Sequence, residues 1–158
     1  MLLFRRADPS EARALTALAL RSKRAWGYDE KFMALVLPDM AVLPEFLRDE
    51  YGIVAEEAGR VLGYAIVRVD NDSAFLRDLF VEPDRFRQGV GTALFTKVTD
   101  YARNRAAKKL TLGGDPNALG FYKRLGMIRS VRNHLSSEAA VCCRSWNSIS
   151  KDPSHRRR

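Results

Sequence analysis

Several residue types are scarce in this sequence of 158 residues, which has only two cysteines and two histidines. Cys142 and Cys143 are adjacent. Neighbours on a strand point to opposite faces, so a disulfide between them would be strained, and we interpret both as small buried residues. Their spacing to His134 and His155 matches no zinc site, and no Ser-His-Asp or Cys-His constellation is recognisable, so we predict no metal centre.

Long apolar runs are also missing. No stretch approaches the roughly 18 apolar residues that a membrane span needs, and Met1–Arg6 reaches its arginines too soon for the apolar core of a signal peptide. Apolar residues make up 46% and charged residues 29%, which is typical of soluble globular proteins and not of disordered chains. We therefore expect a cytoplasmic protein.

Acidic residues are scarce in the second half of the chain. Residues 85–158 contain 16 basic and 4 acidic residues, whereas residues 1–84 contain 11 basic and 15 acidic residues. The net charge of +8 is therefore the sum of −4 and +12, and the basic half suggests an anionic partner. Nucleic acid, an acidic membrane surface and a phosphate-bearing cofactor are all candidates for this partner.

Hydrophobic periodicity and turn residues predict alternating helices and strands. Asp8-Pro9-Ser10-Glu11 has the pattern of a capped helix start, and that helix is expected to end near Arg24. Asp29 is expected to cap a second helix, followed by an irregular stretch over 38–44. A strand at 2–6 precedes these helices, and strands at 52–56, 61–69 and 74–81 form an antiparallel meander.

A loop with two glycines, Arg85-Phe86-Arg87-Gln88-Gly89-Val90-Gly91, follows the meander and begins a helix. Such a loop favours an anion, because the first N–H groups of a helix lack internal partners and the helix dipole attracts negative charge. The glycines allow a close approach of the backbone, and the arginines add positive charge. The loop matches neither the P-loop nor the Rossmann fingerprint, so a tight strand-to-helix connection is the alternative interpretation.

The remaining pattern predicts a strand at 109–113 that pairs parallel with the strand at 74–81. A helix follows from Asp115 to Gly126, then a strand at 127–131 and a further strand near 144–149. We predict a single domain over residues 1–150. Residues 151–158 form a basic tail of net charge +3 that we expect to be flexible.

Two motifs in this order resemble the GNAT superfamily of acetyl-CoA-dependent N-acetyltransferases. The family's pyrophosphate loop is Arg/Gln-x-x-Gly-x-Gly/Ala, and Gly89 and Gly91 match its glycines. Its first position falls on Phe86, which departs from the pattern but lies between Arg85 and Arg87. The resemblance covers about residues 2–131 and is strongest over 76–127.

The second motif of the family, Asn-x-x-Ala-x-x-Phe-Tyr, matches at Ala118, Phe121 and Tyr122. Its Asn position falls on Asp115, and Asn117 follows two residues later. These departures leave individual cofactor contacts open. A catalytically weak or regulatory member that only binds acetyl-CoA is therefore an alternative.

The resemblance implies an α+β fold with three α/β layers. Its sheet is mixed but mostly antiparallel and is flanked by helices, and a central parallel pair of strands, here 76–81 and 109–113, splays apart. In the family, the pantetheine arm of acetyl-CoA lies in that gap, and a backbone N–H there polarises the thioester carbonyl. The residues that the resemblance places at the cofactor are Phe80, Val81, Arg85, Arg87, Gln88, Gly89, Val90, Gly91, Thr92, Asn117 and Tyr122.

The implied reaction is acetyl transfer to a primary amine of a small molecule or peptide, by direct attack in a ternary complex. Tyr122 would be the general acid that protonates the departing CoA thiolate, because the ordinary pKa of tyrosine, about 10, exceeds that of a thiol. The alternative for Tyr122 is a core aromatic on a helix face. Asp78 is the candidate base, with Glu82 the other nearby carboxylate, although Asp78 could instead form a structural ion pair with Arg77 or a neighbouring strand residue.

The acceptor is expected beside the segment that follows the first helix. Trp26 and Tyr28 could line an amine pocket through cation–π contacts, or pack as ordinary loop residues. A cofactor with several phosphates accounts for the basic half, and the sequence has no recognisable nucleic-acid-binding motif, so we disfavour a nucleic-acid partner. We expect no membrane partner. Family members often dimerise through the C-terminal region, so a homodimer is a further expectation.

Overall fold

The computed structural model describes residues 1–130 and 140–145. Its seven-stranded sheet has the order β1-β2-β3-β4-β5-β7-β6, and the only parallel neighbours are β4 and β5. The strands are β1 Leu3–Arg6, β2 Tyr51–Glu57, β3 Arg60–Asp70, β4 Ser73–Val81, β5 Lys109–Gly114, β6 Ile128–Ser130 and β7 Ala140–Ser145. This mixed, mostly antiparallel sheet confirms the predicted fold class.

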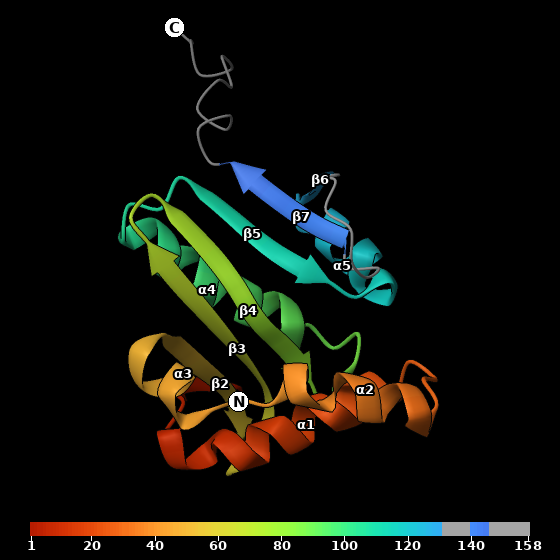
Figure 1. Ribbon diagram of the computed structural model, residues 1–158. Helices are drawn as coiled ribbons and strands as arrows, with labels where there is room; N and C mark the ends of the chain where they lie inside the picture. Colours follow the sequence, from red (N-terminus) through yellow and green to blue (C-terminus); the bar gives the residue numbers. More distant parts are fainter. Residues whose placement is uncertain (131–139, 146–158) are drawn as a thin grey trace, which may run out of the picture.

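Helices cover both faces of the sheet and make three layers, with α1, α2 and α3 on one face and α4 on the other (Figure 1). The helices are η1 Pro9–Glu11, α1 Ala12–Arg24, α2 Glu30–Met40, α3 Pro44–Asp49, η2 Pro83–Arg85, α4 Val90–Asn104, η3 Pro116–Ala118 and α5 Leu119–Arg124. None of the helices in the described ranges is both long enough and apolar enough to cross a bilayer.

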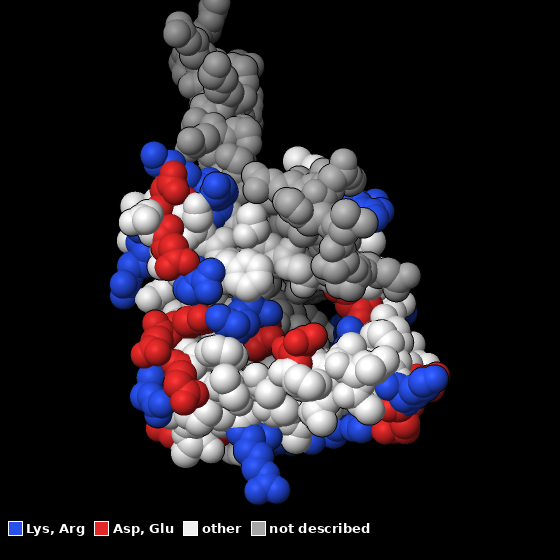
Figure 2. Space-filling view, in the orientation of Figure 1, with Lys and Arg blue, Asp and Glu red and all other residues white. Residues whose placement is uncertain are grey.

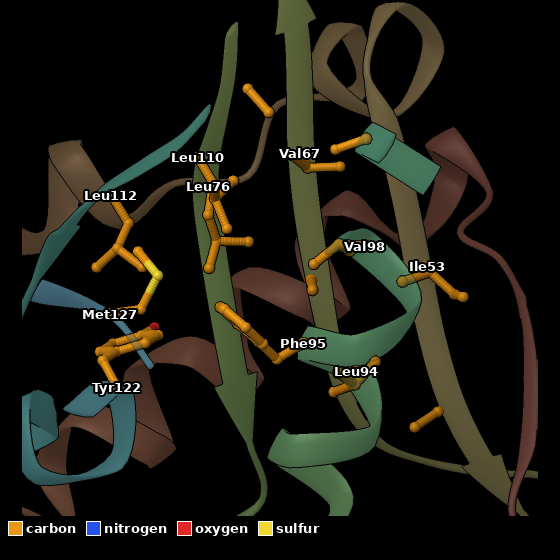
Figure 3. Close-up of a cluster of buried hydrophobic side chains, with 14 of the residues drawn as sticks. Ile53, Val67, Leu76, Leu94, Phe95, Val98, Leu110, Leu112, Tyr122 and Met127 are labelled. Carbon is orange, nitrogen blue, oxygen red and sulfur yellow. The ribbon is translucent and has the colours of Figure 1, made fainter. Parts of the chain in front are cut away.

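Two hydrophobic clusters hold the layers together. One lies between the sheet and α4, where Leu94 and Val98 are fully buried, and it continues past β5 to α5 (Figure 3). The other lies beneath α1, where Leu15 and Leu18 pack with Tyr64 of β3. The sheet therefore has a core on each face, which explains why β3 reads as a nearly continuous apolar run.

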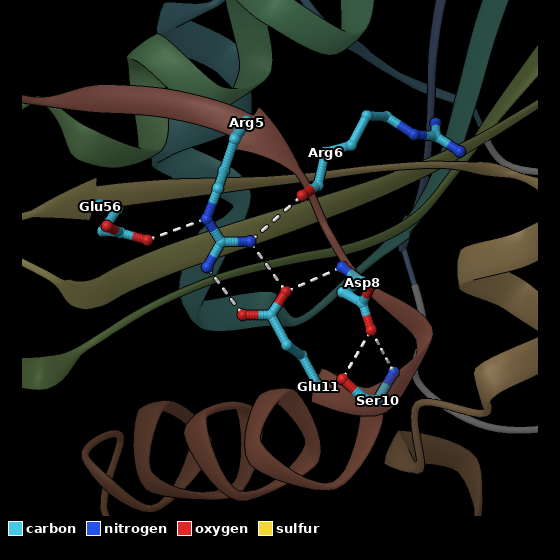
Figure 4. A network of polar contacts seen from close by, with 6 residues as sticks. All are labelled: Arg5, Arg6, Asp8, Ser10, Glu11 and Glu56. Carbon is cyan, nitrogen blue, oxygen red and sulfur yellow. Dashed lines mark hydrogen bonds and ion pairs between the residues drawn. The ribbon is translucent and has the colours of Figure 1, made fainter.

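A polar network fixes the start of the first helix, as the capping pattern predicted (Figure 4). The Asp8 carboxylate accepts the Ser10 N–H at 2.9 Å, and Glu11 accepts the Asp8 N–H at 2.8 Å. Arg5 on β1 donates to both Glu11 oxygens, at 2.8 and 2.9 Å, and to Glu56 on β2 at 2.9 Å. These bonds tie η1 to the edge of the sheet and lower the pKa of Glu11.

The structure corrects three of the predicted boundaries. Helix α2 continues to Met40 with Pro38 in its last turn, and Pro44 begins α3, so the irregular stretch predicted over 38–44 is confined to 41–43. A proline is tolerated in the first turn of a helix, where its missing N–H has no helical partner. The last strand is β7 at Ala140–Ser145, earlier than the predicted 144–149, and it lies between β5 and β6. Residues 146–158, including the predicted tail, lie outside the described ranges.

Candidate functional site

The central parallel pair of strands is joined over only part of its length. The register between β4 and β5 runs from Ser73 opposite Lys109 to Leu76 opposite Leu112 and then stops. From there the two strands diverge toward their C-terminal ends (Figure 1). Among the described residues, the second half of β4 therefore has one backbone edge without a strand partner, which confirms the predicted splay.

A β-bulge marks the point where the strands part. Ile66 of β3 pairs with Asp78, but the next residue, Val67, pairs with Leu76, so Arg77 is an extra residue in β4. The Arg77 guanidinium lies 3.9 Å from the ring centroid of Phe46 in α3. A bulge interrupts the alternation of side chains, and here Arg77 and Asp78 both come to lie on the face that α1 and α3 cover.

The backbone direction of β4 determines which groups face the gap. The Glu82 N–H donates to the Leu62 carbonyl of β3 at 2.8 Å, and hydrogen-bonded pairs alternate along an antiparallel ladder. The N–H and C=O groups of Phe80 therefore face β3, whereas those of Leu79 and Val81 face the gap. This direction favours Val81, together with Leu79, over Phe80 for a contact with the pantetheine arm.

The N-terminus of α4 lies directly after this strand. Gly89 is its N-cap at φ +85°, with no atom within 4 Å of where a Cβ would be. The first helical hydrogen bond runs from the Ala93 N–H to the Gly89 carbonyl at 2.9 Å, so the amides of Val90, Gly91 and Thr92 precede the helical ladder. Open space before unpaired amides at the positive end of a helix suits a phosphate group.

Gly91 has a different role from Gly89. A Cβ at Gly91 would lie 3.3 Å from the Phe121 ring and 3.6 Å from a methyl group of Val81. The missing side chain therefore lets the start of α4 pack closely against both β4 and α5.

The charged side chains of the loop have different partners. Arg85 forms an ion pair with Glu57 at 3.3 Å. Arg87 is exposed and makes no ion pair within the part of the chain that the structure describes. The Gln88 amide donates to the Asp84 carbonyl at 2.8 Å and so fixes the loop. Of the two predicted arginines, Arg87 is the one whose charge is uncompensated.

Tyr122 combines the two interpretations that the sequence left open. Its ring is 7% exposed and packs with Phe95 and Phe121, whose centroids lie 6.2 and 5.0 Å away. Figure 3 shows the side chain beside Met127, projecting from α5 toward β4. The ring is therefore part of the core, and its position beside the gap keeps Tyr122 a candidate for proton transfer.

Two carboxylates on the side of the sheet that α1 and α3 cover, Glu50 and Glu82, are paired with arginine. Arg77 donates to both oxygens of Glu50, at 2.8 and 2.6 Å, and not to Asp78. Glu82 is 7% exposed and accepts the Arg21 Nε–H at 3.1 Å, with a second bond from the same guanidinium. The predicted alternative, an Asp78–Arg77 ion pair, is wrong because Glu50 occupies the guanidinium.

Asp78 differs from these carboxylates because it has no hydrogen bond and no ion pair among residues 1–130 and 140–145. Burial raises its pKa to about 7, although the positive charge of Arg77 opposes that shift. A carboxylate with a pKa near neutrality suits a general base, because it holds a proton about as readily as it releases one. The structure thus leaves Asp78 available for that role.

A third carboxylate, Asp115, joins the two sides of the gap. It caps η3 by accepting the Asn117 N–H at 2.8 Å, and it lies 2.6 Å from the Lys23 ammonium at the end of α1. The Tyr28 hydroxyl donates to the same carboxylate at 3.0 Å and accepts from the Asn117 amide at 3.0 Å. Burial alone would raise the pKa of Asp115, but the bonds from Lys23 and from the Asn117 backbone lower it.

The predicted acceptor residues lie on this segment. Tyr28 stacks on Phe32 at 4.3 Å, and the Lys23 ammonium lies 5.0 Å from the Tyr28 ring centroid. Trp26 is 45% exposed and stacks on Phe86 at 5.7 Å. Figure 2 shows a hollow with charged side chains at its rim, where the strands diverge above α1 and α2. Sequence reasoning missed Lys23, because nothing local signals a contact 92 residues away.

A separate cavity of about 480 Å³ lies at the opposite end of the sheet. Tyr51 and Tyr101, which stack at 3.8 Å, line it with Arg68 and Arg105. None of the predicted site residues lines this cavity. Within residues 1–130 and 140–145, no group of three or more His, Cys, Asp or Glu side chains is placed to hold a metal ion.

Comparison with known proteins places this geometry in context. The model of the acetyltransferase (GNAT) family matches residues 13–127. An uncharacterized N-acetyltransferase of Methanocaldococcus jannaschii is 36% identical over 90 residues, which are 50% of this chain and 40% of that protein. The chain spans between 38% and 58% of the length of the curated relatives that it matches.

Solved structures share the fold. The PaiA N-acetyltransferase from Thermoplasma acidophilum, in complex with coenzyme A, superposes with a TM-score of 0.80 at 13% identity, covering 92% of this chain and 99% of that one. The ribosomal-protein-S18-alanine N-acetyltransferase from Escherichia coli has a TM-score of 0.65 at 22% identity, covering 90% and 91%. At these identities the likeness concerns the fold alone.

Proposed function

This chain belongs to the acetyltransferase (GNAT) family, and we propose that it transfers the acetyl group of acetyl-CoA to a primary amine of a small molecule or peptide. The observation that supports this most is the end of the β4–β5 register at Leu76 and Leu112, beside the N-terminus of α4. An unpaired strand edge next to an anion site suits a ligand that carries a pyrophosphate at one end and a pantetheine thioester at the other.

The residues present fit acetyl-CoA, which would supply an activated acetyl thioester. The amides of Val90, Gly91 and Thr92 would hold the pyrophosphate, and Arg87 would add charge. Backbone groups of Val81 would hold the pantetheine arm, because they face the gap. Gly89 leaves open the space that the phosphates need.

Proton transfer would fall to two side chains, Asp78 and Tyr122. Asp78 would accept one proton from the acceptor ammonium and pass it to solvent, and the neutral amine nitrogen would then bond to the acetyl carbon. As the carbon–sulfur bond breaks, the nitrogen would release its second proton to solvent through Asp78. Tyr122 would donate a proton to the departing thiolate and then recover one from solvent. Each proton and electron pair is thereby accounted for without a further reactant.

The acceptor would enter beside Trp26 and Tyr28. The Lys23 ammonium already lies over the Tyr28 ring at 5.0 Å, so this wall accommodates a cation. The Escherichia coli relative is named for acetylating a ribosomal protein at alanine, which supports a peptide amine among the acceptors. A homodimer and a cytoplasmic location stay predictions from the sequence.

Two assays on the purified chain test this proposal. We expect calorimetry to show saturable binding of acetyl-CoA. We also expect a thiol-release assay to show turnover with at least one acceptor from a panel of small primary amines and of peptides with free N-termini. A chain that does not bind acetyl-CoA contradicts the proposal, and binding without turnover on any acceptor supports the regulatory alternative.

Binding to nucleic acid gains little support from the surface. On the face that Figure 2 shows, basic and acidic side chains are interspersed, and no continuous basic patch is present among the described residues of that face. Titration with duplex DNA at increasing salt tests for nucleic-acid binding, because an affinity that depends on phosphate contacts falls steeply with salt.

A further inference from the structure

Tyr64 in β3 carries a buried hydroxyl with no hydrogen-bond partner in the described part of the chain. The residue is 0% exposed and belongs to the cluster beneath α1. A buried polar group without a partner destabilises the folded state, so such groups are rare and usually have a partner in the working protein. A phenylalanine would fill the same apolar space without that penalty, so the hydroxyl needs an explanation.

The residue beside Tyr64 on this face is Asp78, a partly exposed carboxylate with no hydrogen bond among the described residues. Tyr64 pairs with Phe80 across the β3–β4 ladder, and Ile66 pairs with Asp78, so Tyr64 and Asp78 are diagonal neighbours on one face of the sheet. Burial raises the pKa of Tyr64 well above its ordinary value, and the charge of Asp78 raises it further. The two groups are therefore in electrostatic contact but do not bond directly.

The other charged groups on this side of the sheet already have partners. From α3 and β4, Glu50 and Arg77 bond to each other. From α1 and the end of β4, Arg21 bonds to Glu82. Apolar side chains such as Leu18 of α1 pack there as well. Tyr64 thus offers the Asp78 carboxylate a neutral donor that is buried and has no hydrogen-bond partner among the described residues.

We propose that Tyr64 is a positioning residue for Asp78, and that its hydroxyl donates through one ordered water to the Asp78 carboxylate when that carboxylate serves as the base. A single water gives the buried Tyr64 hydroxyl the partner that it lacks and joins it to the partly exposed Asp78 carboxylate. The bond fixes the direction of the carboxylate toward the gap and stabilises its charged form. This inference rests on the proposed acetyl transfer and adds a residue to it.

The variant Tyr64→Phe removes the hydroxyl and keeps the ring. We expect unchanged affinity for acetyl-CoA and a thermal midpoint that is not lowered. In contrast, the acid limb of the kcat/KM profile should move to higher pH by about half to one unit, because the charged carboxylate loses a hydrogen bond. The control is Tyr51→Phe, which removes the hydroxyl of a tyrosine on β2 that stacks on Tyr101. It should leave the kcat/KM profile unchanged.

A second readout does not depend on turnover. In protein labelled with ¹³C at the aspartate carboxyls, NMR titration should show a higher Asp78 pKa in Tyr64→Phe than in the parent. Adding Tyr64→Phe to Asp78→Asn should change nothing further.

If Tyr64→Phe changed neither the NMR-determined pKa of Asp78 nor the acid limb of the kcat/KM profile, the role of Tyr64 would be overturned. The proposed function would be untouched if Asp78→Asn still removed the limb. An absence of acetyl-CoA binding in the parent chain would instead overturn the proposed function itself.

Discussion

The Lys23 ammonium lies 2.6 Å from the Asp115 carboxylate, although 92 residues separate the two in the chain. Asp115 stands where the family motif has asparagine, and Phe86 stands where the pyrophosphate loop has arginine or glutamine. Asp115 and Phe86 both contact the same short segment at the end of α1. Asp115 binds Lys23 and Tyr28, and Phe86 stacks on Trp26 at 5.7 Å. The two residues therefore attach the end of α1 and the α1–α2 connection to both sides of the proposed cofactor site.

The first prediction concerns this attachment. Asp115→Asn restores the family's residue but leaves the Lys23 ammonium, whose side chain is 17% exposed, without its counter-charge. We expect a loss of about 1–3 kcal/mol in the free energy of unfolding at pH 7, measured by urea denaturation. Asp70→Asn is the matched control, because its ion pair with Arg68 is half-exposed and should contribute little.

The pH dependence of this contribution has a definite sign. The folded-state pKa of Asp115 is lowered, so its stabilisation is complete above the unfolded pKa of about 4 and is lost as the pH falls through the folded value. The stability difference between the parent and Asp115→Asn should therefore shrink below pH 4. A difference that stayed constant down to pH 2 would contradict the ion-pair account.

The second prediction concerns Tyr122. Tyr122→Phe keeps the packing of the ring with Phe95 and Phe121 but removes the proposed acid. We expect kcat to fall by about 10²–10⁴-fold with little change in the dissociation constant of acetyl-CoA, because a general acid acts mainly on the transition state. Tyr101→Phe, on the remote part of α4, is the control and should keep full turnover. Unchanged kcat in Tyr122→Phe would leave that tyrosine a core residue only.

The third prediction concerns Asp78. As the proposed base, Asp78 acts only when it is deprotonated. Because burial raises its pKa to about 7, kcat/KM should rise with pH and level off above about 7. In Asp78→Asn this acid limb should vanish and turnover should fall.

The raised pKa of Asp78 also predicts that removing its charge stabilises the folded state at alkaline pH. A carboxyl whose folded pKa is raised binds more protons in the folded state between pH 4 and 7, so it destabilises the fold as the pH rises. Asp78→Asn should therefore have a higher urea midpoint than the parent at pH 8 and a similar midpoint at pH 4. Lower stability at pH 8 would indicate that Asp78 has a structural partner.

Much of the fold could be predicted because its signals are local. The capping box at Asp8 and the turn at Ala58 and Gly59, both with positive φ, determine where elements begin and end. Gly89 and Gly91, at the N-cap and in the first turn of α4, likewise mark the start of a helix locally. The run through Pro38 was predicted to be irregular, because a proline in the last turn of a helix resembles a break.

The contacts of the site were harder to predict because they are made between distant segments. Arg77 is adjacent to Asp78 in sequence, yet a bulge and a nearby Glu50 direct it elsewhere. The Lys23–Asp115 pair depends on how α1 crosses the open end of the sheet. From the sequence, Tyr64 is one more aromatic residue in a strand. Only the fold shows that its hydroxyl is buried without a partner among the described residues.

The central claim is that acetyl-CoA binds at the N-terminus of α4, and a pair of glycine substitutions tests it most directly. Gly89 and Gly59 have φ of +85° and +76°, and neither has an atom within 4 Å of a Cβ position, so glutamate strains both backbones alike. By calorimetry, we predict that Gly89→Glu weakens acetyl-CoA binding by about tenfold or more, because a carboxylate takes the place of the phosphates, while Gly59→Glu binds as the parent does. Equal affinity in the parent and both variants would contradict the claim.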